Sequence, residues 1–302
     1  MKTDNLAHKA KAVARFKQHP YISQDMEVSV DMYPFPHISI KNLFADDIYN
    51  GMCEKFDTYA SRVPATGERA DGYGAKIYGL TPEDCQRGGY EFLASRIWKQ
   101  FIQVMFDIYF NEQIANQIHV HDVPSQSGWI HRDCQICVGS NAKKLQGVDK
   151  ILLLNNKQHI EYGKDNDNIL KYREQPAAFP KIARSVSGIY YLNNHEEAGK
   201  TLKGGGTGLF KKNDIHTLDT VKEPENNSML LFECGVDSYH TYIGTEEFTR
   251  CSFVQWFHED VDKHLTRKRE DIEKSGLSIH EYFDRWEDTT PWFYHGDYPW
   301  KG

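Results

Sequence analysis

From residue 117 onward, the chain consists mostly of short segments rich in β-branched and aromatic residues, with turn-forming residues between them. Many short strands at such close spacing are typical of antiparallel sheets that form a sandwich or a barrel. The segments that we expect to be strands are residues 117–123, 129–138, 148–154, 184–193, 206–210, 228–233, 238–243 and 249–258. The sequence therefore predicts a β-core over about residues 117–260.

Helical patterns flank this core on both sides. Residues 44–60 carry Ile48, Met52 and Phe56 at four-residue steps, and residues 90–112 carry a longer stripe of the same kind. We also expect helices at 1–18, 261–274 and 278–286, a strand at 34–41 and an irregular loop at 62–80. The expected fold class is mainly β with flanking helices, as a single domain over residues 1–302, with a polar insertion at about 140–180 and a helical and aromatic C-terminal extension at 261–302.

Composition limits the partners and the compartment that we expect. Hydrophobic residues make up 39% of the 302 residues, which is typical of a globular protein. A net charge of −7, without a long basic face, argues against nucleic acid as a partner. The sequence contains no run of 18 apolar residues, so it predicts no membrane span. The charged N-terminus lacks the apolar centre of a signal peptide. Scattered cysteines indicate reduced thiols, so we expect a cytoplasmic protein.

The tripeptide His131-Arg132-Asp133 offers two candidate metal ligands. If it lies in a strand, the imidazole and the carboxylate point to the same side, and Arg132 points away. Alone, such a pair is more often an ordinary hydrogen-bonded pair than a metal site. A third candidate, His240, follows the strongly apolar segment 229–233. Two histidines and one carboxylate form the facial triad that suits non-heme Fe(II).

Arg250 is predicted to lie on the inner wall of the β-core. Alternation along the strand places Arg250, Ser252, Val254 and Trp256 on one face. A buried guanidinium without a partner would cost several kcal/mol. That cost is offset if an anion binds there, and a guanidinium beside a hydroxyl suits a terminal carboxylate gripped through both oxygens.

In this order and spacing, His131-X-Asp133, His240 and Arg250-X-Ser252 resemble the motif of the Fe(II)/2-oxoglutarate-dependent oxygenases. Three further segments resemble the prolyl-hydroxylase branch of that family, namely residues 34–40, 184–193 and 204–210. The resemblance spans roughly residues 34–260. It implies a double-stranded β-helix, or jelly roll, as the core.

The resemblance also implies roles for individual residues. His131, Asp133 and His240 would hold Fe(II), and Arg250, assisted by Ser252, would bind the C5 carboxylate of the co-substrate 2-oxoglutarate. Tyr191 could donate its phenol to the same carboxylate, or it could be a core tyrosine; the sequence does not favour either role. The implied cofactors are Fe(II), 2-oxoglutarate and O2, with ascorbate as a candidate addition.

Nearby residues have competing interpretations. Cys134 and Cys137 match a Cys-X-X-Cys pattern, but no second pair completes a zinc site and no thioredoxin-like context surrounds them, so we favour packing. His119 and His121 form a second His-X-His pair on the preceding strand. We expect them to be buried or to support the site, and one of them could contact substrate.

The expected reaction is hydroxylation, or another oxidation, of an aliphatic C–H bond, with release of succinate and CO2. The expected substrate is a small molecule, such as an amino acid or a natural-product intermediate, because residues 65–80, the insertion and the aromatic tail could cover a closed pocket. A peptidyl or prolyl hydroxylase acting on a protein is the alternative. A non-catalytic jelly-roll binding protein is the alternative from another class. The insertion could be a lid, a substrate loop or a homodimer contact.

Overall fold

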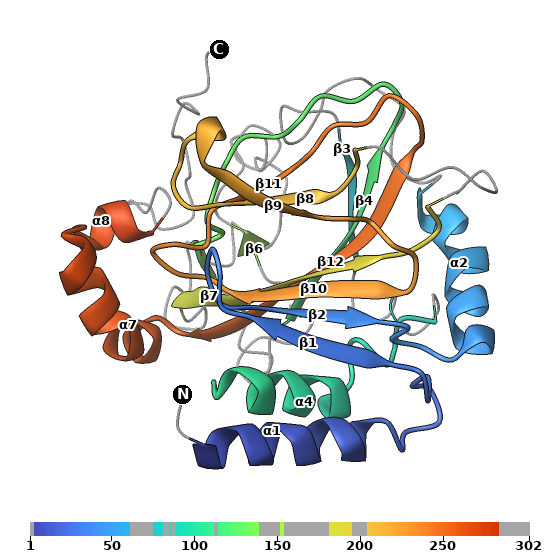
Figure 1. Cartoon of the computed structure of the whole chain (residues 1–302), viewed down its shortest axis with the longest axis horizontal. Coiled ribbons are helices and arrows are strands. Elements are labelled where there is room, and N and C mark those ends of the chain that lie inside the picture. The colour runs from blue at the N-terminus through green and yellow to red at the C-terminus, as the bar shows by residue number, and fades with distance from the viewer. Residues whose placement is uncertain are drawn as a thin grey trace, which may run out of the picture.

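The computed structural model describes residues 3–60, 75–80, 85, 89–111, 114–138, 152–153, 181–194 and 204–283, and it consists of two antiparallel sheets with helices around them (Figure 1). The main sheet has the strand order β1-β2-β10-β7-β12-β4-β3, and β5 pairs with β7 and with β6. Its strands are β1 (Glu27–Asp31), β2 (His37–Lys41), β3 (Ala75–Leu80), β4 (Ile114–His121), β5 (Ile136–Val138), β6 (Leu152–Leu153), β7 (Lys181–Tyr191), β10 (Ser228–Glu233) and β12 (Arg250–Asp260).

A smaller sheet lies opposite the main one and closes the barrel (Figure 1). Its order is β11-β8-β9, formed by β11 (His240–Tyr242), β8 (Thr207–Phe210) and β9 (Leu218–Lys222). Leu209 of this sheet packs in one buried cluster with Ile189, Leu230 and Val254 of the main sheet. Apolar side chains from both sheets therefore fill the interior, and the predicted double-stranded β-helix with flanking helices is confirmed.

Helices α1 (Thr3–Phe16), α2 (Asp46–Ala60) and α4 (Arg96–Phe106) cover the outer face of the main sheet. Side chains that alternate with the inward-facing ones, such as Tyr190 and Phe253, join the helices in a second buried cluster. Trp98 of α4 donates from its indole nitrogen to Gln255 of β12 at 2.6 Å, so this polar contact is satisfied inside the cluster. No helix in the described part of the chain has the length and apolar character needed to cross a bilayer.

The turn before β8 has a backbone that only glycine adopts easily. Gly204 has φ +81°, and a Cβ atom built on it would lie 2.3 Å from the carbonyl oxygen of Gly244. Gly205 also has a positive φ, and its N–H donates to the carbonyl of Ile243 at 2.9 Å. The glycine run that the sequence singled out therefore lets β8 approach the segment that follows β11.

The C-terminal helices α7 (Val261–Ser275) and α8 (Ile279–Tyr282) are joined to the sheet by a buried polar cluster. Glu259 accepts hydrogen bonds from Ser185 at 2.7 Å and from Nδ1 of His264 at 3.1 Å, and it pairs with Arg267. The other ring nitrogen of His264 accepts from the phenol of Tyr282 at 2.7 Å. The cluster therefore connects β7, β12, α7 and α8.

Glu259 should make the stability of the fold depend on pH. Burial alone would raise its pKa, but the hydrogen bonds from His264 and Arg267 outweigh burial and lower the pKa from 4.5 to about 2. A folded-state pKa below the unfolded one stabilises the fold above pH 4.5, and this contribution is lost as the pH falls toward 2. Its size is about 3 kcal/mol, at about 1.4 kcal/mol per tenfold change in acidity.

We expect Glu259→Gln to lower the free energy of unfolding at neutral pH and to flatten its decline between pH 4.5 and 2. Urea unfolding followed by circular dichroism at a series of pH values measures both effects. Acid profiles of equal slope for the two proteins would show that Glu259 does not contribute in this way.

Several local predictions differ from the structure. Residues 75–80 form strand β3 instead of a loop, and the long helix predicted at 90–112 is confined to Arg96–Phe106. The strand predicted at 129–138 is wrong for residues 129–135, which contain only an isolated bridge at His131. Strands β1 and β9 were not predicted. Most of the insertion at 140–180, residues 62–74 of the loop, and the tail beyond residue 283 lie outside the described residues.

Candidate active site

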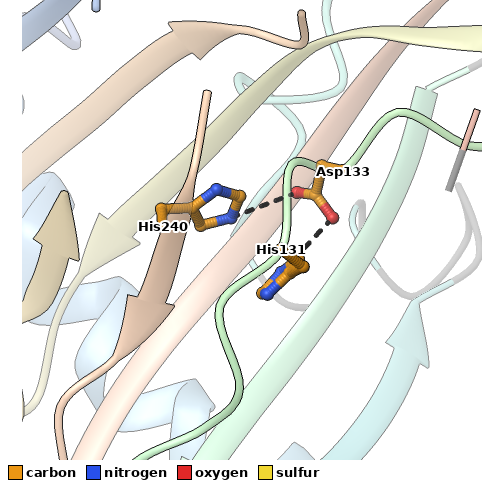
Figure 2. A group of neighbouring side chains, drawn as sticks. All are labelled: His131, Asp133 and His240. Carbon is orange, nitrogen blue, oxygen red and sulfur yellow. Dashed lines mark ion pairs between the residues drawn. The ribbon is translucent and has the colours of Figure 1, made fainter. Parts of the chain in front are cut away.

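His131, Asp133 and His240 come together, each offering one ligand atom within 4.8 Å of the others (Figure 2). His131 and His240 lie opposite each other in an isolated antiparallel bridge, whose backbone hydrogen bonds measure 3.0 and 2.8 Å. Nε2 of each imidazole lies 3.6 Å from a different carboxylate oxygen of Asp133. This is the one group of potential metal ligands found among the described residues.

Both imidazoles are held in the tautomer that a metal ligand needs. Nδ1 of His131 lies 3.0 Å from the carbonyl of Trp129, and Nδ1 of His240 lies 2.8 Å from the carbonyl of Ser238. A carbonyl oxygen can only accept, so each Nδ1 carries the proton and donates it. In the neutral form of each imidazole, Nε2 therefore keeps its lone pair and directs it toward Asp133.

The backbone at Asp133 explains why these side chains meet without a regular strand. Asp133 has φ +61°, in the left-handed region, so the strand alternation assumed from the sequence does not apply there. Arg132 still points away, as predicted: its guanidinium donates to the carbonyls of Glu281 and Tyr282 at 2.6 and 3.2 Å. The segment that bears two candidate ligands is thereby fixed to α8.

Three donors from the main sheet hold the Asp133 carboxylate. Oδ1 accepts from Arg184 at 3.0 Å, and Oδ2 accepts from Ser187 at 2.7 Å and from the indole of Trp256 at 2.8 Å. Burial would raise the pKa of Asp133, but the charge of Arg184 outweighs burial and holds the pKa well below its ordinary value. Burial lowers the pKa of His240 to about 4. At neutral pH the site thus presents a carboxylate and, at His240, a neutral imidazole.

A second group of polar side chains lies around Arg250, which is 3% exposed. Its guanidinium lies 5.3 Å from the ring centres of both Tyr191 and Tyr242, and it forms no ion pair with any described residue. Nε of Arg250 and Oγ of Ser252 are buried without hydrogen-bond partners. A cation and a hydroxyl left in this state fit an anionic ligand, such as a carboxylate.

Tyr191 lies beside Arg250 and already has a hydrogen-bond partner. Its phenol forms a 2.6 Å hydrogen bond with the hydroxyl of Thr207 on β8. Burial raises the pKa of Tyr191, so the phenol keeps its proton at neutral pH. It can therefore still donate one hydrogen bond, either to Thr207 or to a bound ligand.

The other polar residues singled out by the sequence are placed around these two groups. His121 is buried and lies opposite Arg250 in the backbone register of β4 and β12. Its ring stacks on that of Tyr242, with the ring centres 3.8 Å apart. Nε2 of His119 lies 2.9 Å from the side-chain oxygen of Gln117. The thiol of Cys134 is buried and donates to the carbonyl of Gly235 at 3.3 Å, whereas the side chain of Cys137 lies outside the described residues.

Sequence reasoning did not identify the three residues that hold Asp133. Trp256 was predicted to lie on the face of Arg250, and Ser187 has the same strand parity as Tyr191, so strand alternation contained part of the signal. Arg184 has the opposite parity to Ser187, and alternation alone would point it out of the barrel.

The sequence model of the 2OG-Fe(II) oxygenase superfamily matches residues 153–258, which include His240 and Arg250. This match covers about a third of the chain. The match implies Fe(II), 2-oxoglutarate and O2 as cofactors, and the group formed by His131, Asp133 and His240 is a potential iron site. A search of curated protein sequences found no match.

Solved structures similar to this chain include three prolyl hydroxylases. A Pseudomonas putida prolyl-4-hydroxylase has 14% identity and a TM-score of 0.43, and the match covers 82% of this chain and 97% of that one. A Trichoplax adhaerens prolyl hydroxylase, in complex with a hypoxia inducible factor peptide fragment, has 12% identity, a TM-score of 0.48 and coverages of 88% and 97%. The viral collagen prolyl hydroxylase of Paramecium Bursaria Chlorella virus-1 has 12% identity, a TM-score of 0.40 and coverages of 74% and 94%.

Proposed function

We propose that this chain is a dioxygenase that hydroxylates, or otherwise oxidises, an aliphatic C–H bond while converting 2-oxoglutarate to succinate and CO2. The observation that carries the proposal is the convergence of His131, Asp133 and His240, with both Nε2 lone pairs directed at the carboxylate. This donor set fits Fe(II), which when bound supplies the oxidising chemistry that protein side chains lack.

The protein's own groups would bind and orient the co-substrate. Arg250 would grip the far carboxylate of 2-oxoglutarate through two charge-assisted hydrogen bonds, with Ser252 donating to the same group. The tyrosine rings on either side of Arg250 would keep water away from the ion pair and strengthen it. Tyr191 would contribute its phenol in exchange for its bond to Thr207. These contacts would fix the position of the keto acid relative to the metal ligands.

The substrate that we propose is a small molecule, such as an amino acid or a natural-product intermediate. The segments expected to cover its pocket lie mostly outside the described residues, so the proposal about the substrate still rests on the sequence. A prolyl side chain in a peptide or protein is the alternative class, and the test below has an arm for each.

The test supplies the purified chain with Fe(II), 2-oxoglutarate and O2 and measures succinate. One arm adds a pool of free amino acids and secondary metabolites, and the other adds a pool of proline-containing peptides. We expect succinate formation together with a product heavier by one oxygen atom in the first arm, detected by mass spectrometry. An oxidised peptide alone would transfer the assignment to the alternative substrate. Tight binding of 2-oxoglutarate without its consumption in either arm would instead indicate a binding protein.

A further inference from the structure

The Asp133 carboxylate has almost all of its hydrogen-bonding capacity in use before any metal binds. An ionised carboxylate has about four lone-pair sites, two on each oxygen. Oδ2 accepts from both Ser187 and Trp256, and Oδ1 accepts from Arg184. One lone pair, on Oδ1, therefore remains for a metal ion, which predicts that Asp133 binds through a single oxygen.

A β-bulge brings Arg184 to this carboxylate. Along β7, Val186 pairs with Phe257 of β12, but the next pair is Arg184 with His258, so Ser185 has no partner on β12. Because of this extra residue, side chains of β7 before Ser185 face the opposite side from the one that strict alternation predicts. Arg184 and Ser187, three residues apart, therefore both reach Asp133, while Ser185 points out to Glu259 and His264.

The guanidinium of Arg184 is held in place on its other side as well. It is 3% exposed and lies over the indole ring of Trp256, 4.1 Å from the ring centre. Trp256 donates to the same carboxylate, so the two side chains support each other. A planar guanidinium can stack face to face on the indole while it donates, whereas a lysine ammonium has no planar face to stack.

We infer that Arg184 is a positioning residue, which acts through Asp133 to leave a single carboxylate lone pair open to the metal. Arg184, Ser187 and Trp256 together fix the rotation of the carboxylate, and the two donors on Oδ2, Ser187 and Trp256, block binding through both oxygens. The bulge at Ser185 turns Arg184 inward, toward Asp133. The inference rests on the proposed function of His131, Asp133 and His240 as metal ligands.

The test is a titration of the full chain with Co(II), in the absence of 2-oxoglutarate and O2. Arg184→Lys keeps the positive charge but loses the stacked planar donor. We expect the Kd for Co(II) to rise about 10- to 100-fold, as is typical when a group that orients a metal ligand is removed. The visible absorption of bound Co(II) should also change, because it reports the geometry of the ligands.

Ser187→Ala serves as a second, milder variant in case Arg184→Lys folds poorly. It frees a lone pair on Oδ2, so the carboxylate can bind through both oxygens and the Co(II) spectrum should change. Arg267→Lys is the matched control: Arg267 also pairs with carboxylates, those of Glu233 and Glu259, but it does not contact Asp133. It should bind Co(II) with the native Kd and spectrum, even if its thermal midpoint falls.

The possible outcomes separate the inference from the proposed function. The native Kd, within about twofold, and the native spectrum in folded Arg184→Lys and Ser187→Ala would overturn the role of Arg184. Equal weakening in Arg267→Lys would also overturn it, because the effect would then follow general stability. If the native chain itself fails to bind Co(II), the proposed metal site is what fails.

Discussion

Replacing Asp133 with alanine is expected to abolish succinate formation and to weaken divalent metal binding by roughly 100-fold. Protein sites with four ligands bind zinc with about 10–16 kcal/mol, so the loss of one ligand removes on the order of 3 kcal/mol. Asp133 also connects both imidazoles and Arg184. Isothermal titration with Co(II) and a succinate assay with Fe(II) measure the two effects.

His240→Ala tests the same site without leaving Arg184 unpaired. We expect the same loss of succinate formation, with a smaller loss of stability, because no ion pair to a guanidinium is broken. Asp237→Ala is the matched control, since this exposed carboxylate lies three residues before His240 and contributes no ligand atom to the group. Normal turnover in Asp133→Ala or His240→Ala would contradict the assignment of these residues.

Replacing Arg250 with methionine is expected to have opposite effects on binding and on stability. Removing one partner of a buried, hydrogen-bonded charge pair costs about 2–5 kcal/mol. The KM for 2-oxoglutarate should therefore rise by between roughly 30-fold and several thousand-fold. Without the co-substrate, Arg250 is a buried cation that pairs with no described carboxylate. Its loss should raise the thermal midpoint by a few degrees for each kcal/mol of relieved desolvation.

The measurements are the KM for 2-oxoglutarate from succinate formation and the thermal midpoint from calorimetry without 2-oxoglutarate. Co(II) affinity should remain native, because Arg250 has no contact with the three candidate ligands. Arg184→Met provides the comparison: it also removes a buried guanidinium, but one paired with Asp133, and so it should lower the midpoint. A native KM in Arg250→Met would exclude Arg250 from co-substrate binding.

Strand alternation made much of the fold predictable from the sequence. The apolar segments at 229–233 and 249–258 lie within strands of the main sheet, and the inward face of Arg250, Val254 and Trp256 follows from a period of two. The edge strands were missed because Leu218–Lys222 and Glu27–Asp31 are largely polar and exposed, without the composition of a buried strand.

Local irregularities determine the parts of the site that the sequence could not predict. His131 and Asp133 were expected to share a strand face, but they meet through a left-handed residue and a single bridge to His240. The role of Arg184 could not be predicted because a bulge at Ser185 interrupts the side-chain alternation of β7 before Ser187. Both features depend on contacts with residues distant in sequence, and local composition does not encode them.

The central claim is that one metal ion binds between His131, Asp133 and His240, with 2-oxoglutarate extending to Arg250. The most direct test is an anomalous difference map from crystals grown with Mn(II) and 2-oxoglutarate without O2. We expect one peak in contact with both Nε2 atoms and with Oδ1 of Asp133, and a carboxylate paired with Arg250. A metal peak elsewhere, or a carboxylate that does not reach Arg250, would contradict the account.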